Sequence, residues 1–282
     1  MAGPNVVLHQ FLYSHYNEKA RWGLDWKGVR HERRTHLPGP HGPLITRLSG
    51  QTQTPVLVID GNVIAGSAAI LDELERRFPE RPLFPADPGL RAKAAAICDE
   101  FDREIGVAAR TVLFSELIHE PTYMCGVFAE EKPWAVRALY RLTFPLARGF
   151  VAKGNGLVDP ANVARSFDVT ERALDRVARE TGATGHVVGD AFTVADLTCA
   201  SLLAILTAPP HPDMHRPEPV PERVARLLAR WEGHPAIAWV NETYAGTGRR
   251  GPVFDDGTAR RAAQERGRSP RMRARKVSAS AS

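Results

Sequence analysis

The chain of 282 residues is 43% apolar and 24% charged, a composition typical of a globular protein with a sizeable core and room for one or two domains. It contains no apolar run of the roughly 20 residues that span a bilayer, and its first residues lack the pattern of a signal peptide, so we expect a cytoplasmic protein without a membrane partner. The net charge of +5 is local, because residues 247–282 hold ten basic and three acidic residues, +7 in total, against −2 for the rest.

The N-terminal segment predicts a strand followed by a helix. Residues 6–12 (VVLHQFL) are typical of a short buried strand, and residues 16–27 carry an apolar helical stripe. A strand, a corner and a helix in this order indicate the start of a βαβ unit. Residues 31–50 are rich in Pro, Gly and His, which predicts an irregular connection.

Two short apolar runs, PVLVID and NVIA, follow on either side of Asp60-Gly61, a pair typical of a hairpin turn. From Ser67 the stretch SAAILDELERRF has helical spacing, and it ends at Pro79. The segment PERPLFPADPG then indicates a linker. We therefore expect a small α/β domain over residues 1–84.

The rest of the chain before the basic segment has helical periodicity, over about residues 90–118, 129–152, 160–181, 193–207 and 221–231. This predicts an all-helical domain over residues 89–246. Its sharpest signal is AFTVADLTCASLLAIL, where Thr193 and Asp196 form a capping box and Phe192 can pack on Leu197. The helix that follows is almost wholly apolar and is expected at the centre of the domain.

The basic segment 247–282 is poor in apolar residues, which predicts a disordered tail. The alternative is that this tail contacts RNA or another anionic surface. Nucleic-acid binding by the rest of the chain is not expected. The three cysteines have no CxxC spacing and favour neither disulfides nor a thiolate zinc site. His211, Asp213 and His215 lie in a Pro-rich loop without a rigid frame, so we predict no metal and interpret the loop as a lid or connection near the site.

Four motifs in this order resemble the cytosolic glutathione transferases. They are the corner YSHYNEKARWGL, the run QTPVLVIDG, the helix start GSAAI and the FTVADL capping box, and together they span about residues 6–244. The resemblance implies a thioredoxin-like α/β N-terminal domain followed by an all-α domain with an electrophile pocket. It also implies a homodimer that joins the small domain of one subunit to the helical domain of the other.

The resemblance assigns a glutathione site to the small domain. Pro55 matches the family's cis-proline after Thr54, and it is expected to leave the backbone of Val56 free to pair with the cysteinyl part of glutathione. Gln53 stands where the family often places a polar contact to the tripeptide. Ser67 begins a helix whose hydroxyl and N–H groups can hold the γ-glutamyl carboxylate.

Gly66 departs from the family pattern, in which Glu or Asp precedes this serine and pairs with the γ-glutamyl amine. Loss of such a pair costs on the order of 1 to 3 kcal/mol, about tenfold to a hundredfold in affinity. Weak glutathione binding, or preference for another thiol, is therefore expected.

The corner gathers hydroxyl and amide groups at a helix N-terminus, an arrangement that stabilises a thiolate. Aligned on KAR, Ser14 falls where serine-type members such as the theta and zeta classes carry the hydroxyl donor, and where omega-type members carry a reactive cysteine. We therefore favour Ser14 as the donor to the thiolate. Tyr13 and Asn17 remain candidates, as does Tyr16, and Ser14 could instead only cap the helix. His15 is expected at the surface.

The electrophile pocket is expected around residues 98–114, with Phe128, Trp134 and Tyr140 as further candidates. The favoured function is a glutathione transferase that holds glutathione as a thiolate co-substrate and adds it to a small hydrophobic electrophile. A glutathione-dependent isomerase or dehalogenase is the nearest alternative. A transferase-like binding module without catalysis, which recruits a partner through the basic tail, is the other.

Overall fold

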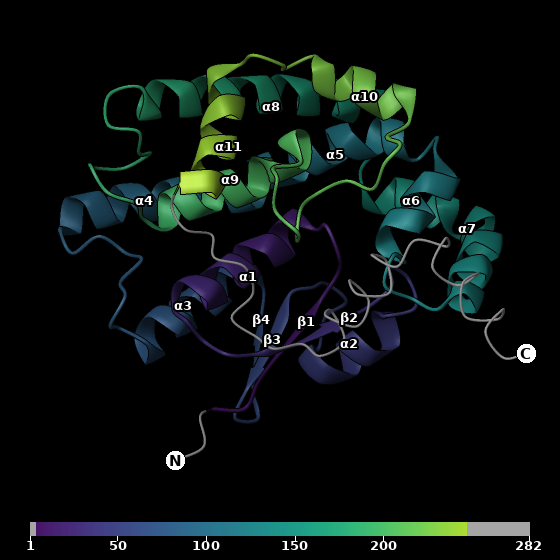
Figure 1. The fold of residues 1–282 in the computed structure, drawn as a ribbon, viewed down its shortest axis with the longest axis horizontal. Helices are drawn as coiled ribbons and strands as arrows, with labels where there is room; N and C mark the ends of the chain where they lie inside the picture. The colour runs from purple at the N-terminus through teal and green to yellow at the C-terminus, as the bar shows by residue number, and fades with distance from the viewer. Residues whose placement is uncertain (1–3, 247–282) are drawn as a thin grey trace, which may run out of the picture.

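The computed structural model describes residues 4–246, in which a four-stranded sheet lies beneath a larger layer of helices (Figure 1). The strands are β1 (Val6–Gln10), β2 (Glu32–Thr35), β3 (Val56–Ile59) and β4 (Asn62–Ala65). Their order is β2-β1-β3-β4, with β1 parallel to β2 and antiparallel to β3, and with β3 antiparallel to β4. The predicted βαβ start and the hairpin are therefore confirmed.

The sheet carries three helices, α1 (His15–Trp26), α2 (Gly42–Ser49) and α3 (Ser67–Arg77). Helices α1 and α3 pack closely at Gly23, where a Cβ atom would lie 2.2 Å from Cδ2 of Leu71. Only a glycine allows this approach without a shift of the leucine. Helix α1 also packs on α9 (Val194–Thr207), so its N-terminus opens between the sheet and the helical layer.

The prediction for residues 31–50 is wrong, because this segment contains β2 and α2. Strand β2 has the sequence ERRT without an apolar face, and it exists because β1 pairs with it along one edge of the sheet, with Val7 opposite Glu32. Helix α2 starts with Pro43 in its first turn, a position that tolerates proline, and it buries only Ile45. Pairing and one buried side chain therefore outweigh the loop-like composition.

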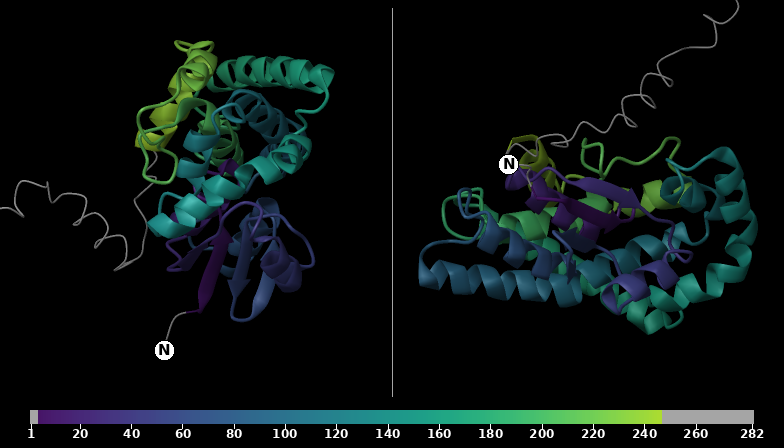
Figure 2. Two further views of the ribbon diagram at one scale, coloured as in Figure 1. Left: turned by 90° about the vertical axis from the view of Figure 1, so that its right-hand side faces the viewer. Right: turned by 90° about the horizontal axis from the view of Figure 1, so that it is seen from below.

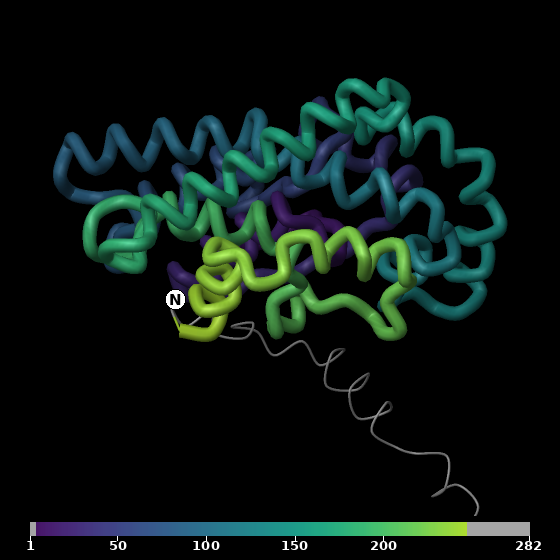
Figure 3. Tube along the Cα trace, turned by 90° about the horizontal axis from the view of Figure 1, so that it is seen from above, coloured from purple at the N-terminus to yellow at the C-terminus, as the bar shows by residue number. Residues whose placement is uncertain are grey.

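The upper layer of helices spreads over the N-terminal elements when it is seen from the side and from above (Figures 2 and 3). The predicted helix over residues 90–118 is observed as α4 and α5 joined by a π-helical segment, whereas α6 and α11 were not predicted. None of the described helices is both long and apolar enough to cross a membrane. The bounds are α4 (Pro88–Glu100), the π-helical segment (Phe101–Ile105), α5 (Gly106–Leu117), α6 (Pro121–Phe128), α7 (Trp134–Gly154), α8 (Pro160–Thr181), α9 (Val194–Thr207), α10 (Glu222–Ala229) and α11 (Pro235–Gly246).

Helix α9 forms the centre of this layer, as its apolar sequence predicts. Every residue from Val194 to Leu206 is buried, and the capping box between Thr193 and Asp196 is present. Phe192 packs against Trp22 and Trp26 of α1, so it ties the start of α9 to the lower layer. The basic segment 247–282 lies outside the described residues.

Candidate functional site

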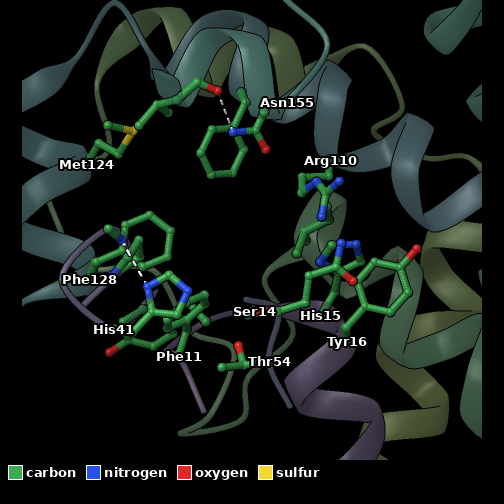
Figure 4. Close-up of a pocket in the computed structure, with 18 of the residues that line it drawn as sticks. Phe11, Ser14, His15, Tyr16, His41, Thr54, Arg110, Met124, Phe128 and Asn155 are labelled. Atoms are coloured by element: carbon green, nitrogen blue, oxygen red, sulfur yellow. Dashed lines mark hydrogen bonds between the residues drawn. The ribbon is translucent and has the colours of Figure 1, made fainter. Parts of the chain in front are cut away.

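A cavity of about 1210 Å³ lies where the first turn of α1 meets the helical layer (Figure 4). Its walls come from the small sheet-bearing part on one side and from α5, α6 and α7 on the other. Among the residues singled out in the sequence for thiol binding and activation, those that line it are Tyr13, Ser14, Tyr16, Gln53, Thr54, Pro55, Gly66 and Ser67. The fold therefore brings the corner, the proline turn and the α3 start to one cavity.

Ser14 is the N-cap residue of α1, yet its side chain makes no capping hydrogen bond. Instead, Nδ2 of Asn17 donates to Oγ of Ser14 over 2.7 Å and to Oγ1 of Thr54 over 3.1 Å. Because each hydroxyl oxygen already accepts a hydrogen bond, each hydroxyl proton is available to an acceptor in the cavity. Asn17 is buried and lies behind the cavity wall.

Tyr13 offers a poorer donor than its position suggests. Its hydroxyl donates to the carboxylate of Glu130 and lies 3.4 Å from Nε2 of His215. Burial and the hydrogen bond to Glu130 raise the pKa of Tyr13 above its ordinary value. The hydroxyl proton of Tyr13 is therefore already donated to a carboxylate, whereas the hydroxyl proton of Ser14 is not donated to Glu130.

The turn before β3 has the predicted cis peptide bond between Thr54 and Pro55. The expectation for Val56 is wrong: it lies inside the sheet, opposite His9 on β1 and Ala65 on β4, and it does not line the cavity. A strand residue with neighbours on both sides cannot accept an added strand. Gln53 and Thr54 are the turn residues at the cavity wall.

The start of α3 presents backbone N–H groups to the cavity. Gly66 has a φ of 94°, a left-handed conformation that favours glycine, and it precedes the buried Ser67. Ala68 and Ala69 continue the lining, and the first turn of α3 contains no acidic residue. The unpaired N–H groups of such a turn attract an anion. At Gly66, where the family carries Glu or Asp, this chain therefore presents only backbone groups to the cavity.

His15 is buried, contrary to its predicted place at the surface. Its Nε2 lies 2.9 Å from the carbonyl of Gly106, so this nitrogen carries the proton and donates. Burial, aided by the charge of Arg110, lowers the pKa of His15 to about 3, and the ring is neutral. Beside it, the Tyr16 hydroxyl donates to the backbone carbonyl of Asp102 over 2.6 Å. Both hydrogen bonds join the first turn of α1 to the helical layer.

The opposite wall is apolar and aromatic. Of the predicted pocket residues, Phe128 and Tyr140 line the cavity, whereas Trp134 does not and is 81% exposed. Helix α7 adds apolar rim residues that the sequence analysis missed, Leu146 and Phe150, both more than 80% exposed. The sequence of α7 could have indicated this apolar surface, because it contains no acidic residue and repeats leucine and phenylalanine at helical spacing. Further apolar lining residues include Val107, Leu113, Phe114, Leu117, Met124, Val127, Phe144 and Val151.

Two arginines, Arg110 of α5 and Arg216 of the loop after α9, also line the cavity and were not predicted. Burial lowers the pKa of both guanidinium groups, that of Arg216 to about 10. Arg216 donates to the backbone carbonyl of Ile205. These cations give an otherwise apolar wall a positive charge.

The loop with His211, Asp213 and His215 lies near the site, as expected. Ligand atoms of Glu18, His211 and Asp213 lie within 4.8 Å of one another. Arginines already engage both carboxylates: Nε of Arg21 lies 2.8 Å from Glu18 and 3.5 Å from Asp213. We interpret the cluster as an ion-pair network that ties this loop to α1.

A comparison with protein families places residues 8–82 in the glutathione S-transferase N-terminal domain family. A probable maleylacetoacetate isomerase of Caenorhabditis elegans is 33% identical over 34% of this chain and 46% of its own length. A glutathione S-transferase of Pseudomonas putida is 31% identical over 38% of this chain and 48% of its own length. The chain thus spans about half the length of the curated relatives it matches.

Solved structures extend the similarity to the helical layer. The β-etherase LigF of a Sphingobium strain matches with a TM-score of 0.57 and 19% identity, over 85% of this chain and 99% of that one. A theta-class glutathione S-transferase of Xanthomonas axonopodis with bound glutathione matches with a TM-score of 0.53 and 18% identity, over 83% and 96% of the two chains. At such identities the match establishes the shared fold, a thioredoxin-like part followed by a helical part.

Proposed function

We propose that this chain, whose residues 8–82 match the glutathione S-transferase N-terminal domain family, binds glutathione as a thiolate beside Ser14 and adds it to a hydrophobic electrophile. One observation carries the proposal. The Ser14 hydroxyl stands at the N-terminus of α1, is not spent on capping, and accepts a hydrogen bond from Asn17. Its proton is therefore directed to whatever anion lies in the cavity.

The two walls suit the two reactants. The N-terminal turns of α1 and α3 offer hydroxyl and N–H donors for the sulfur and the γ-glutamyl carboxylate of glutathione. The facing wall of Phe114, Phe128 and Tyr140 suits an apolar electrophile. Holding both reactants in one cavity replaces a bimolecular encounter with a reaction between neighbours.

The chemical step needs a deprotonated sulfur. A hydrogen bond from Ser14 and the positive end of α1 stabilise the thiolate, so the thiol releases its proton to solvent near neutral pH. The sulfur electron pair then forms a bond to the electrophilic carbon, and a leaving group departs or a double bond is saturated. Gly66 supplies no acid for the γ-glutamyl amine, so we expect weak glutathione binding.

Isomerisation is the second candidate, and similarity to proteins named as maleylacetoacetate isomerases favours it. In that case the sulfur adds to a double bond and later leaves, so glutathione is regenerated. Mass spectrometry of the products separates the two, because only conjugation yields a stable thioether. The predicted homodimer and cytoplasmic location are further expectations, and sedimentation analysis tests the first.

Calorimetric titration of the protein with glutathione at pH 7, combined with the ultraviolet absorbance of the bound thiolate, tests the proposal. We expect saturable binding and a thiol pKa well below that of free glutathione. S-methylglutathione is the matched control, since it keeps the peptide and lacks the titrating proton. No binding at millimolar glutathione, or a bound thiol with its solution pKa, would overturn the proposal and favour a non-catalytic module.

A further inference from the structure

Arg110 is a cation without a protein partner in the cavity. The structure gives its guanidinium no ion pair and no hydrogen bond within residues 4–246, and Nε is buried with no acceptor. In Figure 4 Arg110 lies on the same side of the pocket as His15 and Tyr16, across from Met124 and Phe128. A half-buried guanidinium group whose buried Nε has no acceptor is costly, so this position favours an anion from outside the chain.

The groups around Arg110 cannot supply that anion. The carboxylate of Asp102 also lines the cavity, but Nζ of Lys19 donates to both of its oxygens, over 2.8 and 2.6 Å. His15 is neutral, and Tyr16 spends its proton on the carbonyl of Asp102. The second arginine of the wall, Arg216, adds positive charge.

We propose that Arg110 binds a carboxylate of the electrophile, so that the enzyme's substrates are hydrophobic, in particular aromatic, carboxylic acids. A guanidinium group forms paired hydrogen bonds to a carboxylate and matches its planar geometry. The surrounding aromatic wall contacts the rest of such a molecule. The reaction at this site rests on the proposed function, whereas binding of the acid does not.

Glutathione itself carries two carboxylates and is the other source of such an anion. The positions expected to hold glutathione, Gln53 and Ser67, belong to the sheet-bearing part, whereas Arg110 belongs to α5 in the helical layer. The proposal therefore predicts that the glutathione dissociation constant is unchanged in Arg110→Gln. A rise of tenfold or more would assign Arg110 to glutathione and overturn the proposal.

The kinetic test compares 4-chloro-3-nitrobenzoate with its methyl ester, in the wild type and in Arg110→Gln. In both substrates the sulfur bonds to the ring carbon that bears chlorine, the C–Cl bond breaks, chloride leaves with the electron pair, and the thiol proton goes to the buffer. We expect kcat/KM for the benzoate to fall about 10- to 100-fold, as for loss of a hydrogen bond to a charged group, with little change for the ester. Equal losses on both substrates would overturn the proposal.

Arg103→Gln is the matched control, because Arg103 is exposed, pairs with Asp99 and does not line the cavity. It removes the same charge about two helical turns earlier, and we expect both substrates to be unaffected. A fall in benzoate turnover equal to that of Arg110→Gln would show a long-range charge effect and overturn the assignment to Arg110.

A binding test separates this inference from the proposed function. 4-Methyl-3-nitrobenzoate has no leaving group, and its calorimetric binding needs no glutathione. We expect the wild type to bind it at least tenfold more tightly than Arg110→Gln does. If this holds while glutathione neither binds nor reacts, the proposed function fails and the carboxylate site stands. If the acid and its methyl ester bind the wild type equally, the carboxylate site fails whatever the thiol chemistry.

Discussion

Asn17 donates to the hydroxyl oxygen of Ser14 over 2.7 Å, and the same amide nitrogen donates to Thr54 over 3.1 Å. One buried amide thus sets the direction of two hydroxyls that come from the α1 corner and from the proline turn. Since a hydroxyl that accepts in this way keeps its proton for another partner, the pair acts as a preset donor. A thiolate in the cavity is the acceptor that the proposed function places there.

Replacing Ser14 with alanine removes that donor. We expect the pKa of bound glutathione to rise and kcat/KM to fall about 10- to 100-fold, the size of a lost hydrogen bond to a charged group. The dissociation constant of glutathione should change little, because the peptide contacts remain. Thiolate absorbance against pH gives the pKa. Unchanged absorbance in Ser14→Ala, with a loss in Tyr13→Phe instead, would transfer the role to Tyr13.

Asn17→Asp reverses the hydrogen bond that orients Ser14. A carboxylate can only accept, so the hydroxyls of Ser14 and Thr54 would turn toward it and away from the cavity. We expect a raised pKa of the bound thiol, a lower kcat and a near-normal KM for the electrophile. Thr54→Val is the control that removes only the second hydroxyl. Because Asn17 is buried, thermal unfolding is measured in parallel, and a normal thiol pKa in a folded variant contradicts the positioning role.

The sequence was sufficient to predict the elements that local patterns specify. The capping box at Thr193 and Asp196, the buried helix after it and the hairpin at Asp60 each depend on residues close in the chain, and all are observed. Strand β2 and helix α2 were missed, because their stability comes from pairing with β1 and from one buried side chain, Ile45. Tertiary contacts of this kind leave no local pattern.

The candidate site, like the fold, could be predicted from the sequence only in part. The resemblance to a family pointed to Ser14, Thr54 and Ser67, which the fold brings to one cavity. The place of Val56 inside the sheet, the burial of His15 and the isolation of Arg110 depend on which chain segments meet, and single positions in the sequence do not encode them. An arginine on a helix is usually a surface residue, so the sequence did not predict that Nε of Arg110 is buried.

Substitution of Gly66 tests whether an acidic side chain at this position raises the affinity for glutathione, and how much backbone strain lowers the stability of the protein. Its φ of 94° suits glycine, and no atom of another segment lies within 4 Å of a Cβ atom added at this position, so space is available and conformation is the obstacle. We expect Gly66→Glu to bind glutathione about tenfold to a hundredfold more tightly through its γ-glutamyl amine, and to lose about 1 to 3 kcal/mol of stability. Gly66→Ala should lose the stability without the gain in affinity. Equal affinities in the two variants would contradict an amine contact at this position.

His15 makes stability dependent on pH. Its folded pKa of about 3 lies below the ordinary value of 6.5, so between these values the unfolded chain binds a proton that the folded protein does not. Stability is therefore fully present above pH 6.5 and falls as the pH drops, by about 2 kcal/mol at pH 5 for this group. His15→Gln keeps a donor to Gly106 and cannot titrate. Urea unfolding at pH 7 and pH 5 should show a smaller decrease for the variant, and equal decreases would contradict a buried neutral His15.

The apolar rim of α7 provides a matched pair of substitutions. Leu146 is 82% exposed and lines the cavity, whereas Leu142, one turn earlier, is 77% exposed and does not. We expect Leu146→Ser to raise KM for an apolar electrophile about 3- to 10-fold, because a contact worth about 1 kcal/mol is lost, and to leave glutathione binding unchanged. Leu142→Ser removes a similarly exposed leucine and should have the wild-type KM. Equal changes in the two variants would mean that α7 acts as a general apolar surface, whereas a change confined to Leu146→Ser places the electrophile against the cavity face of α7.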